Sequence, residues 1–135
     1  CGTHLPQKLF EKARVRLMDA RTLGAYGESL AAAYYRKQGF DIVAANYRTR
    51  MGEVDLIVAS RKLLVFVEVK TRSRGALAPG RCSVTKTKQK RIIAAAKAYL
   101  AAHPEWDCAM RFDVYEVTRQ ENTVQEVCIE NAFMV

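Results

Sequence analysis

The sequence predicts an α/β or mixed-sheet α+β fold in which helices flank a central sheet. Residues 53–59 and 63–70 are short runs that are apolar on both faces, and segments with apolar residues at helical spacing precede and follow them. Strands buried on both sides belong to the centre of a sheet that helices cover. The predicted order of elements is αβββαββ.

The chain is long enough for one compact core. It has 135 residues, of which 50% are hydrophobic, so disorder is not expected for most of its length. Residues 1–20 carry mixed charge and only a loose apolar pattern, and we expect them to form an arm, helical or disordered in part. Residues 21–135 are predicted to form a single domain.

The elements follow from local patterns. Apolar residues at helical spacing predict a helix over 23–38, which Gly39 ends, and a second helix over 85–102, which stops before Pro104. Runs rich in β-branched and aromatic residues predict strands, which lie at 40–46, 53–59, 63–70, 110–117 and 123–129. Glycine and proline predict a flexible loop over 71–80.

The composition of the chain favours some classes of function and argues against others. The chain has 22 basic and 14 acidic residues, a net charge of +8, which suits a polyanion binder but also a merely cationic surface. The four cysteines are too scattered for a zinc or redox motif, and we expect ordinary thiols at Cys1, Cys82, Cys108 and Cys128. No apolar stretch is long enough for a membrane span and no leader is visible, so we expect a cytoplasmic protein with no membrane partner.

Acidic residues interrupt the two most apolar runs. If strands 53–59 and 63–70 form a hairpin centred between Arg61 and Lys62, Asp55 faces Glu68 and Glu53 faces Lys70, all on one side of the sheet. A loop of four residues keeps this register without the glycine or asparagine that a two-residue turn prefers.

Two carboxylates facing each other, roughly 5 Å apart, repel unless a cation lies between them. Oxygen ligands of this kind suit Mg²⁺ or Mn²⁺, which can polarise a phosphodiester or activate a water. Lys70, on the same face, is placed to orient that water or to neutralise charge on the phosphate. The alternative is that Glu53, Asp55 and Lys70 form partly buried ion pairs with no catalytic role.

Five ordered motifs between about residues 21 and 117 resemble a known family. They are Gly24-x-x-Gly27-Glu28, Asn46-x-Arg48, Gly52-Glu53-Val54-Asp55-Leu56-Ile57, Val65-Phe66-Val67-Glu68-Val69-Lys70-x-Arg72 and Arg111-Phe112-Asp113-Val114. Together they are similar to the YraN-like family of bacterial proteins. The element order with Asp55 and Glu68-x-Lys70 also resembles the restriction-endonuclease-like PD-(D/E)xK nuclease superfamily.

The superfamily resemblance implies roles for individual residues. Asp55, Glu68 and the carbonyl of Val69 would be metal ligands, and Lys70 the general catalyst that places the attacking water. Glu28 matches a glutamate that approaches the metal in the Holliday-junction-resolvase-like branch; its alternative is a solvated helix acid. Two departures stand out: Val54 replaces the proline of the superfamily name, and the loop after Arg74 lacks the aromatic residue expected from the family.

Cations gather where the second predicted helix begins. They oppose the helix dipole there, and a bound phosphate would relieve this. We therefore expect a track for the nucleic-acid backbone, although a solvated lysine face is the alternative. Its candidate residues are Arg48, Arg72, Arg74, Lys86, Lys88, Lys90 and Arg91.

The sequence thus favours a metal-dependent endonuclease that hydrolyses phosphodiester bonds of DNA, with branched or structured DNA as a candidate substrate. DNA is favoured over RNA. A non-catalytic nucleic-acid-binding or assembly module is the first alternative, and a structural protein that binds another protein is the second. Resolvases of similar fold act as symmetric dimers, so a homodimer is also open, although no residue pattern specifies its interface.

Overall fold

The computed structural model of the protein describes residues 7–73 and 84–135. Cys1, Cys82, Arg74 and the predicted loop from residue 74 to 80 lie outside these ranges. Among the described cysteines, Cys108 and Cys128 are free thiols, as expected.

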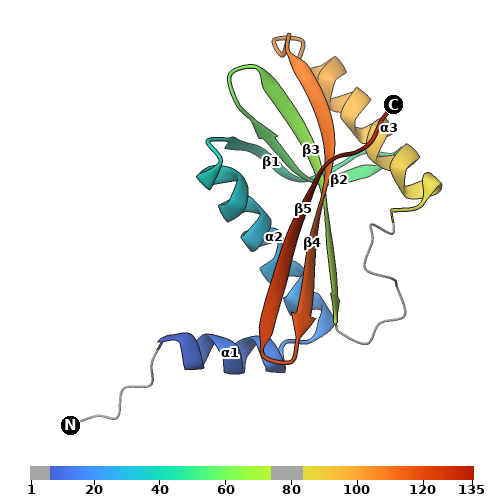
Figure 1. The fold of residues 1–135 in the computed structure, drawn as a ribbon. Coiled ribbons are helices and arrows are strands. Elements are labelled where there is room, and N and C mark those ends of the chain that lie inside the picture. Colours follow the sequence, from blue (N-terminus) through green and yellow to red (C-terminus); the bar gives the residue numbers. More distant parts are fainter. Residues whose placement is uncertain (1–6, 74–83) are drawn as a thin grey trace.

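The structure is a mixed α/β fold in which helices flank a five-stranded sheet (Figure 1). The predicted order αβββαββ is found, preceded by one more helix within the arm. In chain order the elements are α1 (Gln7–Leu17), α2 (Ala20–Lys37), β1 (Asp41–Arg48), β2 (Glu53–Ala59), β3 (Leu63–Ser73), α3 (Lys86–Ala102), β4 (Ala109–Gln120) and β5 (Thr123–Phe133). None of the helices within the described ranges is long and apolar enough to cross a membrane.

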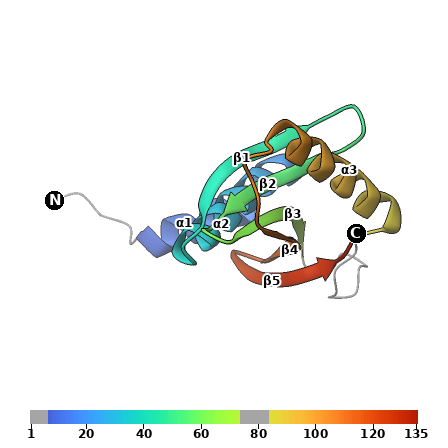
Figure 2. The ribbon, with the colours of Figure 1, turned by 90° about the horizontal axis from the view of Figure 1, so that it is seen from above.

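The strands lie in the order β1-β2-β3-β4-β5, so that β1 and β5 are the edges in the view from above (Figure 2). All neighbours are antiparallel except β3 and β4, which α3 connects as a parallel pair. This pairing corrects the predicted start of the loop at residue 71. Thr71, Arg72 and Ser73 continue β3, because β4 extends far enough to pair with them.

The sheet is buried on both faces, as the apolar strands predict. Tyr35 and Ala31 of α2 pack with Leu56, Val58 and Val67 on one face. On the other face, Ile92, Ala96 and Tyr99 of α3 pack with Ile57 and Phe66. Residues that alternate along β2 and β3 therefore face different helices, which lie on opposite sides of the sheet.

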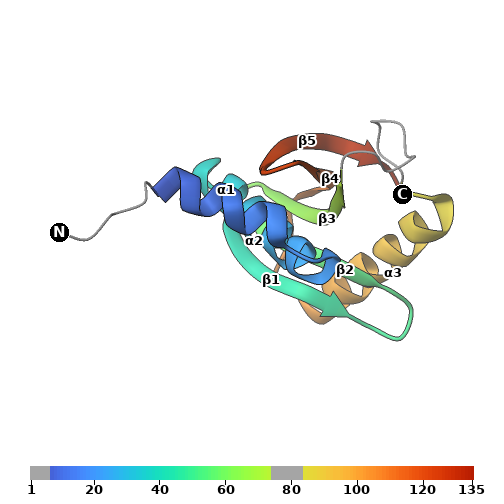
Figure 3. The same ribbon diagram turned by 90° about the horizontal axis from the view of Figure 1, so that it is seen from below.

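The arm is anchored to the sheet through α1, which lies beside α2 and the turn between β4 and β5 (Figures 1 and 3). Arg119 of β4 donates to the carbonyl oxygens of Val15 and Met18 at the end of α1. Val15 is buried, whereas Leu9 and Phe10 are exposed. Ordered contacts thus extend into residues that the sequence assigned to the arm.

The motif Arg111-Phe112-Asp113-Val114 forms the buried polar centre of the fold. Asp113 is fully buried and accepts hydrogen bonds from the Arg111 guanidinium at 2.8 and 2.9 Å, from the Tyr35 hydroxyl at 2.7 Å and from the Asn131 amide at 3.0 Å. A buried carboxylate is tolerated when it is paired and hydrogen-bonded in this way. The motif therefore joins β4, β5 and α2.

Gly52 sets the distance between the sheet and α3. A Cβ atom at this position would collide with the carbonyl group of Arg91 on α3. Only a residue without a side chain allows the helix backbone to approach the turn before β2 so closely. The glycine of the Gly52-Glu53-Val54-Asp55 motif thus fixes the first turns of α3 over the acidic end of β2.

We expect Gly52→Ala to lower the free energy of unfolding by about 1–3 kcal/mol, since the helix must move away to make room. Denaturant unfolding of the purified variant measures this loss. Gly24→Ala is the matched control: its Cβ would lie 3.9 Å from Thr71 Oγ1, an ordinary contact, and alanine favours the helix. Equal stability of the two variants would contradict the close approach.

Candidate functional site

The hairpin of β2 and β3 has the register that the sequence predicts, over the residues that pair. Leu56 to Ala59 lie opposite Val67 to Leu64, with four residues between the last paired ones, Ala59 and Leu64. The ladder with β3 ends at Leu56, whereas the ladder of β2 with β1 continues to Val54 and Glu53. The two strands therefore part where Asp55 and Glu68 lie.

The Asp55 side chain accepts a backbone hydrogen bond from β3 where the ladder between β2 and β3 ends. Its Oδ2 accepts a hydrogen bond from the Val69 amide at 2.8 Å, which satisfies a backbone donor of β3. Asp55 is partly buried and lies next to the Glu68 carboxyl, which Lys88 of α3 contacts. Val69 thus contributes its N–H to the site, and a ligand role for its carbonyl stays a prediction.

Glu68 is the buried acid of the site, with 6% of its surface exposed. Within the described part of the chain its Oε1 has no hydrogen-bond partner. Burial, and then the neighbouring Asp55 carboxylate, raise the pKa of Glu68 to about 8, because both disfavour its negative charge. The positive charges of Lys88 and Lys70 act in the opposite direction and only partly offset this rise.

Lys88 of α3 reaches into the site, although the sequence predicted it as a residue of the phosphate track. Its Nζ lies 3.2 Å from Glu53 Oε1 and 3.7 Å from Glu68 Oε2. Burial disfavours the charge of Lys88, but the Glu68, Glu53 and Asp55 carboxylates outweigh burial and raise the pKa of Lys88. The ammonium therefore stays charged inside the acidic group.

The other acids of the predicted site differ in their surroundings. Glu53 is half-exposed, and the hydrogen bond and charge of Lys88 lower the pKa of Glu53. Glu28, half-buried on α2, follows Gly27, which packs against the Thr71 and Val69 side chains of β3. In residues 7–73 and 84–135 no three His, Cys, Asp or Glu side chains gather as a metal site, so a ligand role for Glu28 stays a prediction.

The predicted cationic residues divide into buried and exposed groups. Arg72 pairs with Glu116 at 3.0 Å, and both side chains are about nine-tenths buried. Arg48 pairs with Glu53 at 3.8 Å while 75% of its side chain is exposed. Lys86, Lys90 and Arg91 are exposed at the start of α3, where Thr85 caps the helix and accepts from the Lys88 amide at 3.1 Å.

Sequence reasoning missed two contacts of this face, Lys88 with Glu68 and Arg72 with Glu116. The first depends on where α3 crosses the sheet, which the sequence does not show. The second follows from the parallel pairing of β3 and β4. In this pairing Lys70 lies opposite Glu116, so Glu116 shares the face of Lys70 and Arg72. The sequence alone did not establish that these strands are neighbours.

The oxygen atoms of Glu68 and Asp55 are candidate ligands for a divalent ion. Glu68 Oε1 is a buried oxygen that lacks a partner among the described residues, and it lies in a side chain next to a second carboxylate. Such a pair is stabilised by a proton or by a cation, and carboxylate oxygens are the ligands that Mg²⁺ and Mn²⁺ prefer. The donor set therefore fits a divalent ion.

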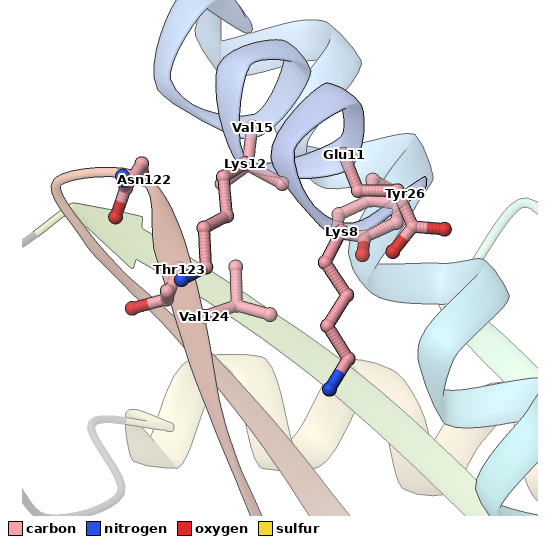
Figure 4. Close-up of a pocket in the computed structure, with 8 residues that line it drawn as sticks. All are labelled: Lys8, Glu11, Lys12, Val15, Tyr26, Asn122, Thr123 and Val124. Atoms are coloured by element: carbon pink, nitrogen blue, oxygen red, sulfur yellow. The ribbon is translucent and has the colours of Figure 1, made fainter. Parts of the chain in front are cut away.

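A concavity away from these acids lies between α1, Tyr26 of α2 and the turn before β5 (Figure 4). Its volume is about 180 Å³, and Lys12 extends from α1 toward Thr123 at the start of β5. Glu11 is the only carboxylate among its lining residues, so it does not offer the paired acids of the first site.

The fold and the site define a mixed α/β protein with a buried acid, Glu68, beside the partly buried Asp55 on the central strands of its sheet. Its residues 27–117 match the family described as Uncharacterised protein family UPF0102, to which the chain belongs. This confirms the family resemblance predicted from the five motifs.

Relatives in several bacteria match most of the chain. The UPF0102 protein of Geobacter metallireducens is 41% identical over 113 residues, which cover 84% of this chain and 93% of that protein. The UPF0102 protein of Alkaliphilus oremlandii is 42% identical over 84% of this chain and 98% of that protein. That of Anaeromyxobacter dehalogenans is 44% identical over 73% of each.

The raised pKa of Glu68 predicts a pH dependence of stability in the metal-free protein. Between its ordinary value of 4.5 and about 8, the folded protein keeps a proton that the unfolded chain releases, so stability falls as the pH rises. Glu68→Gln has no such proton, and we expect it to be more stable than the original protein above about pH 8, by on the order of 2–3 kcal/mol.

Denaturant unfolding between about pH 4 and 9 measures the two curves, which should separate as the pH rises. Glu105→Gln, at an exposed acid, is the matched control and should follow the original protein. Parallel curves for Glu68→Gln and the original protein would contradict a raised pKa.

Proposed function

We propose that the protein is a Mg²⁺- or Mn²⁺-dependent endonuclease that hydrolyses phosphodiester bonds of DNA, with branched or structured DNA as a candidate substrate. The observation that carries the proposal is the buried Glu68 beside Asp55, with an oxygen that lacks a partner among the described residues. A buried acid with a raised pKa is typical of functional sites, because such an acid does not stabilise the fold. The resemblance to the PD-(D/E)xK superfamily and its restriction-endonuclease-like fold is part of the same proposal.

The residues of the site have distinct roles in the proposed reaction. Asp55 and Glu68 hold the ion, and the Val69 amide keeps Asp55 oriented through its 2.8 Å hydrogen bond. Lys70 lies two residues after Glu68 on the same strand and face, where its ammonium can orient the attacking water or stabilise charge on the phosphate. When bound, the ion polarises the phosphodiester and lowers the pKa of a water. The Val69 carbonyl and Glu28 are proposed as further ligands.

A phosphate track is proposed to approach the site from the start of α3. Lys86, Lys90 and Arg91 are exposed there, and the first turn of the helix contains no acid of its own. Arg48 adds an exposed cation across the turn before β2. Backbone phosphates bound along this line would bring the chain of a nucleic acid to Asp55 and Glu68.

A second candidate function is a non-catalytic nucleic-acid-binding or assembly module. The ion pair between Lys88 and Glu68 favours it, because an internal cation already offsets part of the acidic charge. The two candidates differ in their products: the module binds in a salt-sensitive way and cuts nothing.

The first test measures cleavage of labelled single-stranded, duplex, flapped and four-way-junction DNA and of RNA, at low salt with Mg²⁺ or Mn²⁺. We expect cut products from at least one DNA, and a loss of about a hundredfold or more in Asp55→Asn and Glu68→Gln, because each removes a charged ligand. Glu105→Gln, which removes a carboxylate on the surface, should cut as the original protein does.

Cleavage that persists in both Asp55→Asn and Glu68→Gln would reject the nuclease. Binding that falls with salt and leaves every substrate intact would instead support the non-catalytic module.

The phosphate track predicts a change in salt dependence. Replacing Lys86 and Lys90 together with glutamine should weaken binding to all DNA sequences alike and reduce the slope of log Kd against log salt by about two, one for each lost phosphate contact. Fluorescence anisotropy with Ca²⁺ in place of Mg²⁺ measures the slope. Lys37→Gln with Lys62→Gln, at exposed lysines elsewhere, is the charge-matched control, and an equal change there would remove the track.

A further inference from the structure

One lysine of α3 lies among the acids of the site. The Lys88 ammonium contacts a half-exposed carboxylate, Glu53, at 3.2 Å and a buried one, Glu68, at 3.7 Å. It thus contacts two carboxylates from one side-chain position, and they differ in burial: 37% of the Glu53 side chain is exposed but only 8% of that of Glu68.

The helix that carries Lys88 is held in place over the acids. Thr85 Oγ1 accepts from the Lys88 amide at 3.1 Å, and the Arg91 carbonyl packs directly on Gly52, which precedes Glu53. The Lys88 side chain is 30% exposed, whereas neighbouring Lys86 and Lys90 are solvent-facing. The backbone of α3 therefore places Lys88 near the acids, in contrast to the solvent-facing lysines on the same helix.

An ammonium and a divalent ion cannot both stay on Glu68. Their charges have the same sign, and in a partly buried site repulsion at a few ångströms is worth several times what it is in water. Glu53 offers the ammonium a second carboxylate, already at hydrogen-bond distance, at the solvent side of the site.

We propose that Lys88 is a built-in cation that competes with the divalent ion for Glu68 and withdraws to Glu53 when the ion binds. The proposal rests on the proposed function, because it takes Asp55 and Glu68 as the metal ligands. Lys88 then lowers the metal affinity of the metal-free site. Glu53 sets how easily the exchange occurs.

The test is the affinity for Mn²⁺ alone, measured at fixed pH and low salt by electron paramagnetic resonance of the free ion. Lys88→Met should bind Mn²⁺ about three- to tenfold more tightly, since the competing charge is gone. Lys97→Met removes the same charge from the exposed side of the same helix, farther from the acids, and should change the Kd less than about twofold.

Glu53 supplies the second arm of the test. Glu53→Gln should weaken Mn²⁺ binding, because the ammonium loses its alternative partner and stays on Glu68. In the Lys88→Met background the same substitution should have a smaller effect, since there is no ammonium left to hold. Equal effects of Glu53→Gln in the two backgrounds would overturn the exchange between Glu68 and Glu53.

The outcomes separate this proposal from the proposed function. If the original protein and Glu68→Gln bind Mn²⁺ equally or not at all, the metal site itself fails and both proposals fall. If Glu68→Gln loses binding but Lys88→Met behaves as Lys97→Met does, only the role of Lys88 is overturned. Circular dichroism checks that Lys88→Met is folded, and Lys88→Gln replaces it if it is not.

Discussion

The burial of Glu68 next to Asp55 is the constraint on which the other features of the site depend. Two carboxylates at close quarters in a sheet core destabilise the fold unless protons, cations or hydrogen-bond donors compensate them. The protein supplies partial compensation from three directions: the Val69 amide on Asp55, the Lys88 ammonium on Glu68, and the charge of Lys70 along the same strand. The pKa of Glu68 is raised in spite of these groups, so they compensate the two carboxylates only in part. One more proton or cation would therefore stabilise the pair.

The sheet creates this site by parting two of its strands. β2 pairs with β3 up to Leu56 and then continues with β1 alone, so the residues before Leu56 are free to present side chains in place of ladder hydrogen bonds. Gly52 lets α3 lie close to the sheet where the two strands part, and Thr85 caps the first turn of that helix. A glycine, a strand junction and a helix cap therefore act together, although they are far apart in the sequence.

The sequence predicts the local part of this arrangement well and the remote part poorly. The register of the hairpin follows from its centre and from side-chain alternation, and β2 and β3 confirm it over their paired residues. By contrast, Lys88 and Glu68 meet only because of the crossing of α3 over the sheet, and Arg72 and Glu116 only because β3 and β4 are parallel neighbours. Spacing along a chain gives no measure of such contacts, so the sequence predicts Lys88 and Arg72 only as residues of the phosphate track.

The buried pairs also change how the net charge of +8 is understood. Arg72 with Glu116 and the bidentate Arg111 with Asp113 each join one positive charge to one buried negative charge. Internal pairs of this kind contribute nothing to the net charge, so the whole excess of positive charge belongs to the remaining residues. Among these, Lys86, Lys90 and Arg91 are exposed where α3 begins, next to the acids. In the proposed function these exposed cations would attract the polyanion and the acids beside them the metal ion, which is the charge arrangement that metal-assisted chemistry on a phosphate requires.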